Sequence, residues 1–130
     1  MNKIKDVKIG SDDNYVMFHD IQIYEDTNIY NAVMYFTAKN DFLQVTSNSS
    51  TFHGTELLDF FRKLKEVYDT LKGSIKIESV ENNLVINVEA KLQGHISFTG
   101  IVRQITGMDN ECRYHVEIDQ SYFMNKLNEF

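Results

Sequence analysis

The sequence predicts an α+β fold in which a mostly antiparallel β-sheet of about eight strands packs around one central amphipathic helix, with a short C-terminal helix. Two observations favour this class. Residues 52–73 are the only long stretch with the three- and four-residue periodicity of a helix. Short apolar segments separated by turn sequences make up most of the remaining chain. A chain of 130 residues has the usual size of one domain, so we expect a single domain over residues 1–130.

Residues 52–73 are predicted to form the central helix, with Thr55 as N-cap and Gly73 as the left-handed residue that follows the last turn. Its apolar side chains form one wide stripe, which we expect to pack on the sheet. The stripe consists of Leu57, Leu58, Phe60, Phe61, Leu64, Val67, Tyr68 and Leu71.

Four strands are expected before the helix, at residues 3–9, 15–24, 29–39 and 42–46. The turns between them are predicted at residues 10–14, 25–28 and 40–41, and residues 48–51 read as a polar loop. The third strand is apolar on both parities, which is typical of a central strand. In the second strand, Tyr15, Met17, Ile21 and Ile23 share one parity, and His19 interrupts it. A bulge is therefore expected near His19 and Asp20.

The segment after the helix predicts a four-stranded antiparallel meander with one solvated face. Its apolar face is expected to carry Ile75, Ile77, Leu84, Ile86, Val88, Ala90, Ile96, Phe98, Gly100, Val102, Cys112, Tyr114, Val116 and Ile118. Turns are predicted at residues 81–83, 93–94 and 107–110. Asp119 is expected to cap a short final helix over residues 121–130.

The charge balance is acidic, with 13 Lys and Arg against 19 Asp and Glu and a formal net charge of −6. A general nucleic-acid binder is normally basic, so we expect no nucleic-acid partner. The candidate partner-binding residues are the acidic pairs Asp12 with Asp13 and Glu25 with Asp26, which would face a basic protein. Polar turns that only keep the chain soluble explain the same residues.

Several kinds of site are not indicated by the sequence. Cys112 is the single cysteine, which rules out an intrachain disulfide and favours a reducing compartment such as the cytoplasm. We find no phosphate-binding glycine loop, no nucleophile elbow and no paired metal-ligand motif, so no cofactor, metal or catalytic residue is expected. The N-terminus lacks the apolar core of a signal peptide, and no apolar run approaches the length of a membrane span.

His95, His115 and Glu117 form the one constellation with possible chemistry. Both histidines fall on the parity opposite to the apolar face of the meander, where Glu117 joins them. Two imidazoles and a carboxylate on one sheet face can perform acid–base hydrolysis, for example in a small nuclease. Exposure of alternate residues on a strand explains the same pattern without any activity.

Residues 54–84, GTELLDFFRKLKEVYDTLKGSIKIESVENNL, together with Gly94-His95-Ile96 and Asp119-Gln120-Ser121-Tyr122, resemble the WapI-type immunity proteins. The resemblance covers about residues 52–127. These are small cytoplasmic bacterial proteins that neutralise the toxin domains of contact-dependent or secreted polymorphic toxins. The resemblance implies a binding protein that is not an enzyme, with the C-terminal domain of a cognate toxin as its partner. A small hydrolase and an interaction domain without a toxin remain the alternatives.

Overall fold

The computed structural model describes residues 2–3, 6–24, 32–104 and 110–123. Within these ranges the strands form two antiparallel sheets, one six-stranded and one four-stranded. The N-terminal sheet contains β1 (Asn2–Lys3), β2 (Val7–Gly10), β3 (Tyr15–Ile23), β4 (Ala32–Lys39), β5 (Gln44–Thr46) and β6 (Ser50–Phe52). The C-terminal sheet contains β7 (Ser74–Glu78), β8 (Leu84–Ala90), β9 (His95–Arg103) and β10 (Glu111–Asp119). Helix α1 (Gly54–Thr70) connects the two sheets.

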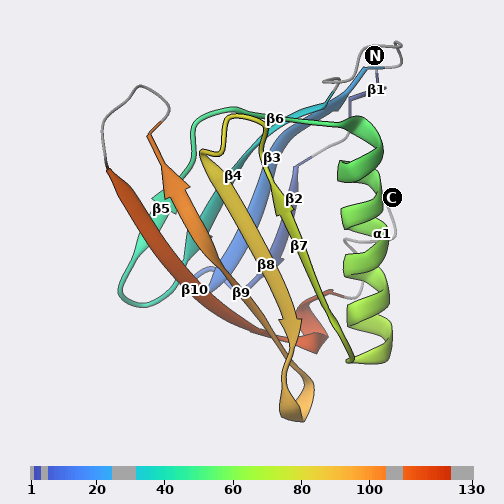
Figure 1. The fold of residues 1–130 in the computed structure, drawn as a ribbon. Coiled ribbons are helices and arrows are strands. Elements are labelled where there is room, and N and C mark those ends of the chain that lie inside the picture. The colour runs from blue at the N-terminus through green and yellow to red at the C-terminus, as the bar shows by residue number, and fades with distance from the viewer. Residues whose placement is uncertain (1, 4–5, 25–31, 105–109, 124–130) are drawn as a thin grey trace.

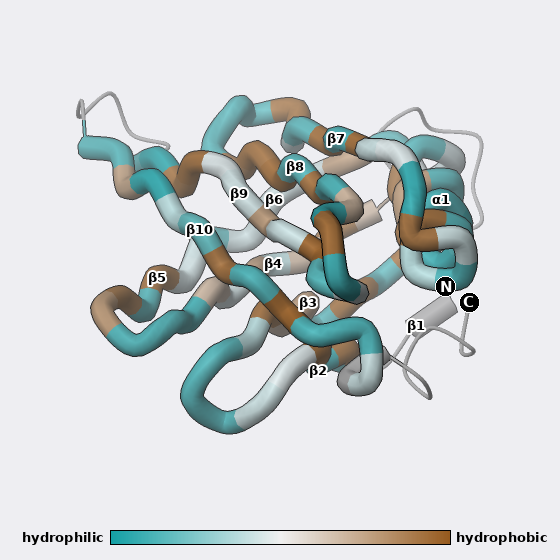
Figure 2. Tube along the Cα trace, turned by 90° about the horizontal axis from the view of Figure 1, so that it is seen from below, coloured by the Kyte–Doolittle hydropathy of each residue, from teal (hydrophilic) through white to brown (hydrophobic). Residues whose placement is uncertain are grey.

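The two sheets face each other, and α1 lies along one side of the pair, next to β7 (Figure 1). Viewed from below, the strands of the C-terminal sheet lie over those of the N-terminal sheet, and α1 closes one end of the space between them (Figure 2). The α+β class, the antiparallel pairing and the single long helix are confirmed for the described residues. The helix is beside two sheets, however, and not at the centre of one.

Aromatic side chains from both sheets and from α1 meet in the core. Phe18 on β3 packs against Phe36 on β4 at 5.2 Å and against Phe61 on α1 at 5.1 Å between ring centroids. Phe36 also lies 5.4 Å from the ring of Tyr114 on β10. One apolar cluster therefore joins the sheets and the helix. The predicted stripe of α1 is confirmed, since Leu57, Phe60, Phe61, Leu64 and Val67 are buried.

Strand β3 contains the predicted bulge, because its register with β4 shifts between His19 and Gln22. Tyr15 and Met17 share a parity with Ile21 and Ile23 in the sequence, but they are only half-buried. Val16 and Phe18 are fully buried before the bulge, whereas Ile21 and Ile23 are buried after it. An extra residue in one strand reverses the side-chain parity, so one buried face uses both parities of the sequence.

The bounds of several N-terminal strands differ from the prediction. The strand expected at residues 3–9 is two strands, β1 and β2, which both pair with β3. The strand expected from Phe42 begins at Gln44, because the Asn40 Oδ1 atom accepts hydrogen bonds from the N–H groups of Phe42 and Leu43 and closes a turn. The expected loop at residues 48–51 contains most of β6, which pairs with the central strand β4.

Both predicted caps of the central helix were wrong. The N-cap is His53, and no side-chain hydrogen bond caps this end among the described residues. Thr55 lies inside the first turn. Leu71, with φ of 54°, is the left-handed C-cap, and its N–H donates to the Val67 carbonyl oxygen. Gly73, with φ of 93°, instead redirects the chain into β7.

The four-stranded meander is confirmed, with the order β10-β9-β8-β7. Asn82 and Gln93 have positive φ in the predicted hairpin turns, where these side chains tolerate such geometry better than β-branched residues do. At the C-terminus, residues Gln120–Phe123 form a 3₁₀ turn, and Asp119 Oδ1 accepts a hydrogen bond from the Ser121 N–H. The rest of the predicted final helix and the turns at 25–28 and 107–109 lie outside the described residues. No helix in the described ranges is long and apolar enough to cross a membrane.

Candidate protein-binding site

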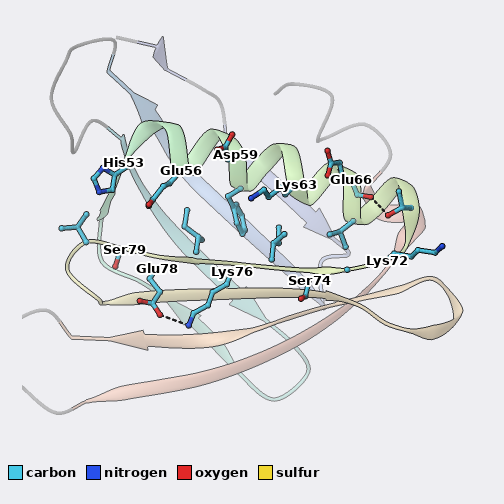
Figure 3. A pocket seen from close by; sticks show the side chains of 17 residues that line it. His53, Glu56, Asp59, Lys63, Glu66, Lys72, Ser74, Lys76, Glu78 and Ser79 are labelled. Atoms are coloured by element: carbon cyan, nitrogen blue, oxygen red, sulfur yellow. Dashed lines mark hydrogen bonds and ion pairs between the residues drawn. The ribbon is translucent and has the colours of Figure 1, made fainter.

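A groove of about 1220 Å³ runs between α1 and β7, and we call it the α1–β7 groove. Because the chain turns back after α1, β7 is antiparallel to the helix and forms the opposite wall (Figure 3). Phe60, Val67 and Ile77 line the groove and are nearly fully buried, which gives it an apolar base. Charged side chains line both walls: Glu56, Asp59, Lys63 and Glu66 from α1, and Lys76 and Glu78 from β7.

Strand β7 exposes one backbone edge to this groove. The sheet order ends at β7, so β8 is its only strand neighbour in the described part of the chain. The Ala90 N–H donates to the Gly73 carbonyl, and the Ser79 N–H donates to the Leu84 carbonyl. The backbone N–H and carbonyl groups of the odd-numbered residues from Gly73 to Ser79 therefore point toward β8. Antiparallel pairing alternates the direction of the backbone groups, so those of Ser74, Lys76 and Glu78 face away from β8.

The charges of the groove are unevenly distributed. Glu56 and Asp59 lie on α1 near the end where β7 carries Glu78, whereas Lys72 lies near the other end (Figure 3). Lys76 Nζ pairs with Glu78 Oε1 at 2.9 Å, and Arg62 pairs with Asp59 at 3.3 Å. Each of these pairs is exposed and contributes little to stability. Glu56 has no ion-pair partner among the residues described, so this end keeps an excess of negative charge.

The predicted acidic turns are only partly described. Asp12 and Asp13 lie in the turn between β2 and β3, whereas Glu25 and Asp26 lie outside the described residues. Lys8 donates a hydrogen bond to Asp12 at 2.8 Å, which, together with its charge, lowers the pKa of the Asp12 carboxyl. Lys39 Nζ contacts the Asp13 carbonyl at 3.2 Å. Two lysines therefore offset part of the negative charge of this turn.

The same turn is held against the other edge strand of the C-terminal sheet. The Asn14 side-chain amide donates to the Glu117 carbonyl, and the Asn40 amide donates to the His115 carbonyl at 2.8 Å. Both carbonyls belong to β10, which is the edge strand opposite β7. The acidic turn and the α1–β7 groove therefore lie at opposite edges of this sheet.

The histidines on the outer face of the meander separate into two groups. His115 Nε2 lies 3.1 Å from Ser97 Oγ and 3.4 Å from Glu117 Oε1. His95 is paired in register with Asp119, four positions further along β10. Hydrogen bonds from Ser121 lower the pKa of Asp119, and His95 lowers it further. The structure thus joins His115 to Glu117, but it places His95 beside a different carboxylate.

The remaining candidate groups are metal ligands and the single cysteine. No group of three or more His, Cys, Asp or Glu residues in the described ranges has the geometry of a metal site. Cys112 is half-buried on β10, where its Sγ lies 3.7 Å from the Arg113 carbonyl oxygen.

The α1–β7 groove was not predicted from the sequence. The alternation of Ser74, Lys76 and Glu78 with two isoleucines indicates a strand, but it does not say whether that strand is at an edge. The sequence offers one indication that this strand is at an edge: it is the first strand of a meander, and the first strand of a meander pairs with one following strand. Whether a helix lies beside that edge depends on tertiary packing, which a local sequence pattern does not determine.

Comparison with known proteins identifies the family. The model of the immunity protein WapI-like family matches residues 9–130. The resemblance predicted over residues 52–127 is therefore confirmed and extends to the N-terminal strands. Neither a curated protein nor a solved structure matches the chain.

Proposed function

The chain belongs to the WapI-like immunity protein family, and on this premise we propose that it binds and neutralises the C-terminal domain of a cognate bacterial toxin in the cytoplasm of its own cell. The toxin would be of the contact-dependent or secreted polymorphic kind. The observation that carries the proposal is the family match over nearly the whole chain, residues 9–130. The net charge of −6 supports a basic partner surface, such as the active site of a nuclease toxin.

Neutralisation by binding requires no reacting residue in this chain. The protein acts by occupying or covering the functional surface of the toxin, so one molecule inhibits one toxin domain. Co-expression in a toxin-sensitive cell tests this directly. Cells that express the toxin domain encoded beside this gene should stop growing, and the chain should restore growth. A toxin domain from an unrelated locus serves as the control and should not be neutralised. Failure to rescue cells from the neighbouring toxin contradicts the proposal.

We also propose a role for the acidic pairs Asp12 with Asp13 and Glu25 with Asp26 in attracting a basic toxin. Exposed charges act mainly on the association rate and are screened by salt. Asp12→Asn with Asp13→Asn should therefore slow association at low salt and leave dissociation nearly unchanged. The same loss of charge on the exposed Asp69 and Glu89 is the control. Equal association rates for the two double variants would remove the acidic turn from the binding surface.

A further inference from the structure

We propose that the α1–β7 groove binds an extended segment of the cognate toxin domain, which pairs with β7 and adds a fifth strand to the four-stranded sheet. This inference rests on the proposed function, because it takes the toxin as the partner. It assigns the contact to a surface that the acidic-turn hypothesis does not include. Pairing of an extended peptide with an exposed sheet edge is a general mode of peptide recognition.

The backbone of β7 supplies the hydrogen bonds for such a segment. Ser74, Lys76 and Glu78 each direct one N–H and one carbonyl away from β8 and toward the groove. Residues two apart on a strand repeat at about 6.6–6.8 Å, a spacing that only another extended chain matches. An unpaired row of donors and acceptors is a template for strand addition unless the protein covers it.

The two edges of this sheet are treated differently. At β10, side-chain amides of Asn14 and Asn40 reach across from the N-terminal sheet and bond the carbonyls of Glu117 and His115. At β7, the backbone groups of Ser74, Lys76 and Glu78 that point away from β8 face a groove of about 1220 Å³. One edge is closed by the fold itself, whereas the other is accompanied by a space that a peptide segment can enter.

One backbone hydrogen bond links another extended segment of the chain to the residues just beyond β7. Val80 is the next residue that faces away from β8, and its N–H donates to the Thr51 carbonyl at 2.8 Å. Thr51 belongs to β6, so an extended segment already lies just beyond the end of β7. Thr51 donates two hydrogen bonds to the carboxylate of Glu81, from its backbone N–H at 2.9 Å and from its hydroxyl at 2.8 Å. A bound segment would make further backbone hydrogen bonds along Glu78 and Lys76.

The geometry favours a single projecting segment over a second copy of this chain. In a second copy, α1 also runs along β7, so two helices would crowd a pairing of the two β7 edges. The apolar base at Phe60 and Val67 suits a segment with apolar side chains on the face directed inward. The excess negative charge at Glu56 suits a Lys or Arg at the end of the segment near Val80.

A proline substitution tests the backbone pairing with a matched control. Lys76→Pro removes the N–H that faces the groove and leaves the ladder to β8 intact, and proline is tolerated at such edge positions. Lys76→Ala loses the same ion pair to Glu78 but keeps the N–H. Titration calorimetry with the purified neighbouring toxin domain should show binding by the proline variant at least about tenfold weaker than by the alanine variant. Equal affinities of two folded variants would overturn the inference.

Hydrogen exchange on the wild-type chain provides a second readout that needs no substitution. The amides of Ser74, Lys76 and Glu78 should exchange quickly in the free protein and become protected when the toxin domain is added. Rescue of growth without this protection overturns the strand pairing but leaves the proposed function in place. Protection of these amides by self-association, seen as a dimer in sedimentation, also overturns it. If the chain neither binds nor neutralises the toxin, both proposals fail.

Discussion

Tyr114 on β10 lies directly over Gly100 on β9, its partner in the strand register. The Tyr114 hydroxyl passes across the glycine and donates a 2.8 Å hydrogen bond to the Val85 carbonyl on β8. A Cβ atom at residue 100 would lie 2.6 Å from the Tyr114 hydroxyl oxygen and 1.9 Å from the Val85 carbonyl oxygen. One tyrosine therefore links three strands of the meander, and only glycine leaves room for it.

Gly100→Ala should accordingly destabilise the protein, because the methyl group overlaps the Val85 carbonyl, which the ladder to β9 holds in place. Overpacking of this kind typically lowers the free energy of unfolding by about 1–3 kcal/mol, and backbone overlap places the expected value near the upper end. Urea denaturation measures the change. Thr99→Ala, on the outer face of the same strand, should stay within about 0.5 kcal/mol of wild type. Similar losses for the two variants would contradict the close contact.

Tyr114 should also make stability depend on alkaline pH. Burial raises the pKa of the Tyr114 hydroxyl above its ordinary value of 10.0. The folded protein therefore keeps this proton when the unfolded chain has released it. The contribution of the group is complete below about pH 10, and it is lost by about 1.4 kcal/mol per pH unit above that. Tyr114→Phe lacks this dependence but loses the hydrogen bond, at a cost of about 1 kcal/mol near neutral pH.

Denaturation of both proteins at about pH 9 and about pH 11 measures the difference. The advantage of the wild type over Tyr114→Phe should shrink as the pH rises. An advantage that stays constant over this range would show that the hydroxyl ionises equally in the folded and unfolded chains.

Much of the fold could be predicted from the sequence, because local patterns determine the apolar stripe of the helix and the alternation of the meander strands. Leu57, Phe61 and Leu64 recur at helical spacing, and all three are buried on one face of α1. Features that depend on tertiary contacts could not be predicted from the sequence. Ser50 looked like loop because it is polar, yet it is fully buried in β6, where its hydroxyl bonds Asn83. The caps at His53 and Leu71 likewise follow from how the helix meets the neighbouring strands.

The candidate site was less predictable than the fold. Charge alone pointed to Asp12 and Asp13, but the structure shows lysines beside this turn. The α1–β7 groove arises from the order of strands in a sheet and the seating of a helix beside its edge. Neither property is local in sequence. The family resemblance indicated a binding protein without indicating which surface binds.

His19 should titrate below the ordinary value for histidine. Its ring stacks on Tyr35 at 4.3 Å, and its Nε2 lies 2.8 Å from the Thr37 hydroxyl. Burial lowers the pKa of His19 below 6.5, and the negative charge of Asp6 opposes this shift. The stability contributed by the neutral ring is therefore complete above 6.5 and is lost as the pH falls through the lower folded pKa.

An NMR titration of the imidazole resonances measures this pKa. Asp6→Asn should lower the pKa of His19 further, because it removes the opposing charge. The substitution retains an oxygen that can accept the hydrogen bond from the Asp20 N–H. A pKa of 6.5 or higher in the wild type would contradict the burial of this ring.

The outer-face histidines should be dispensable for protection. His115 contacts Ser97 and Glu117 on an open surface, with 59 % of its side chain exposed. A binding protein with its contact at β7 does not need an imidazole there, whereas a hydrolase that uses these groups does. His95→Ala with His115→Ala should therefore rescue toxin-expressing cells as well as wild type does. Loss of rescue by a folded double variant would favour the hydrolase alternative.

We propose that the chain neutralises its toxin by one-to-one binding. The most direct measurement is a titration of the purified neighbouring toxin domain with the purified chain, in which residual toxin activity is followed at each step. We predict that activity falls in proportion to added protein and disappears at an equimolar ratio. Activity that persists at several-fold molar excess of the chain, or that disappears at a small fraction of an equivalent, would contradict one-to-one inhibition.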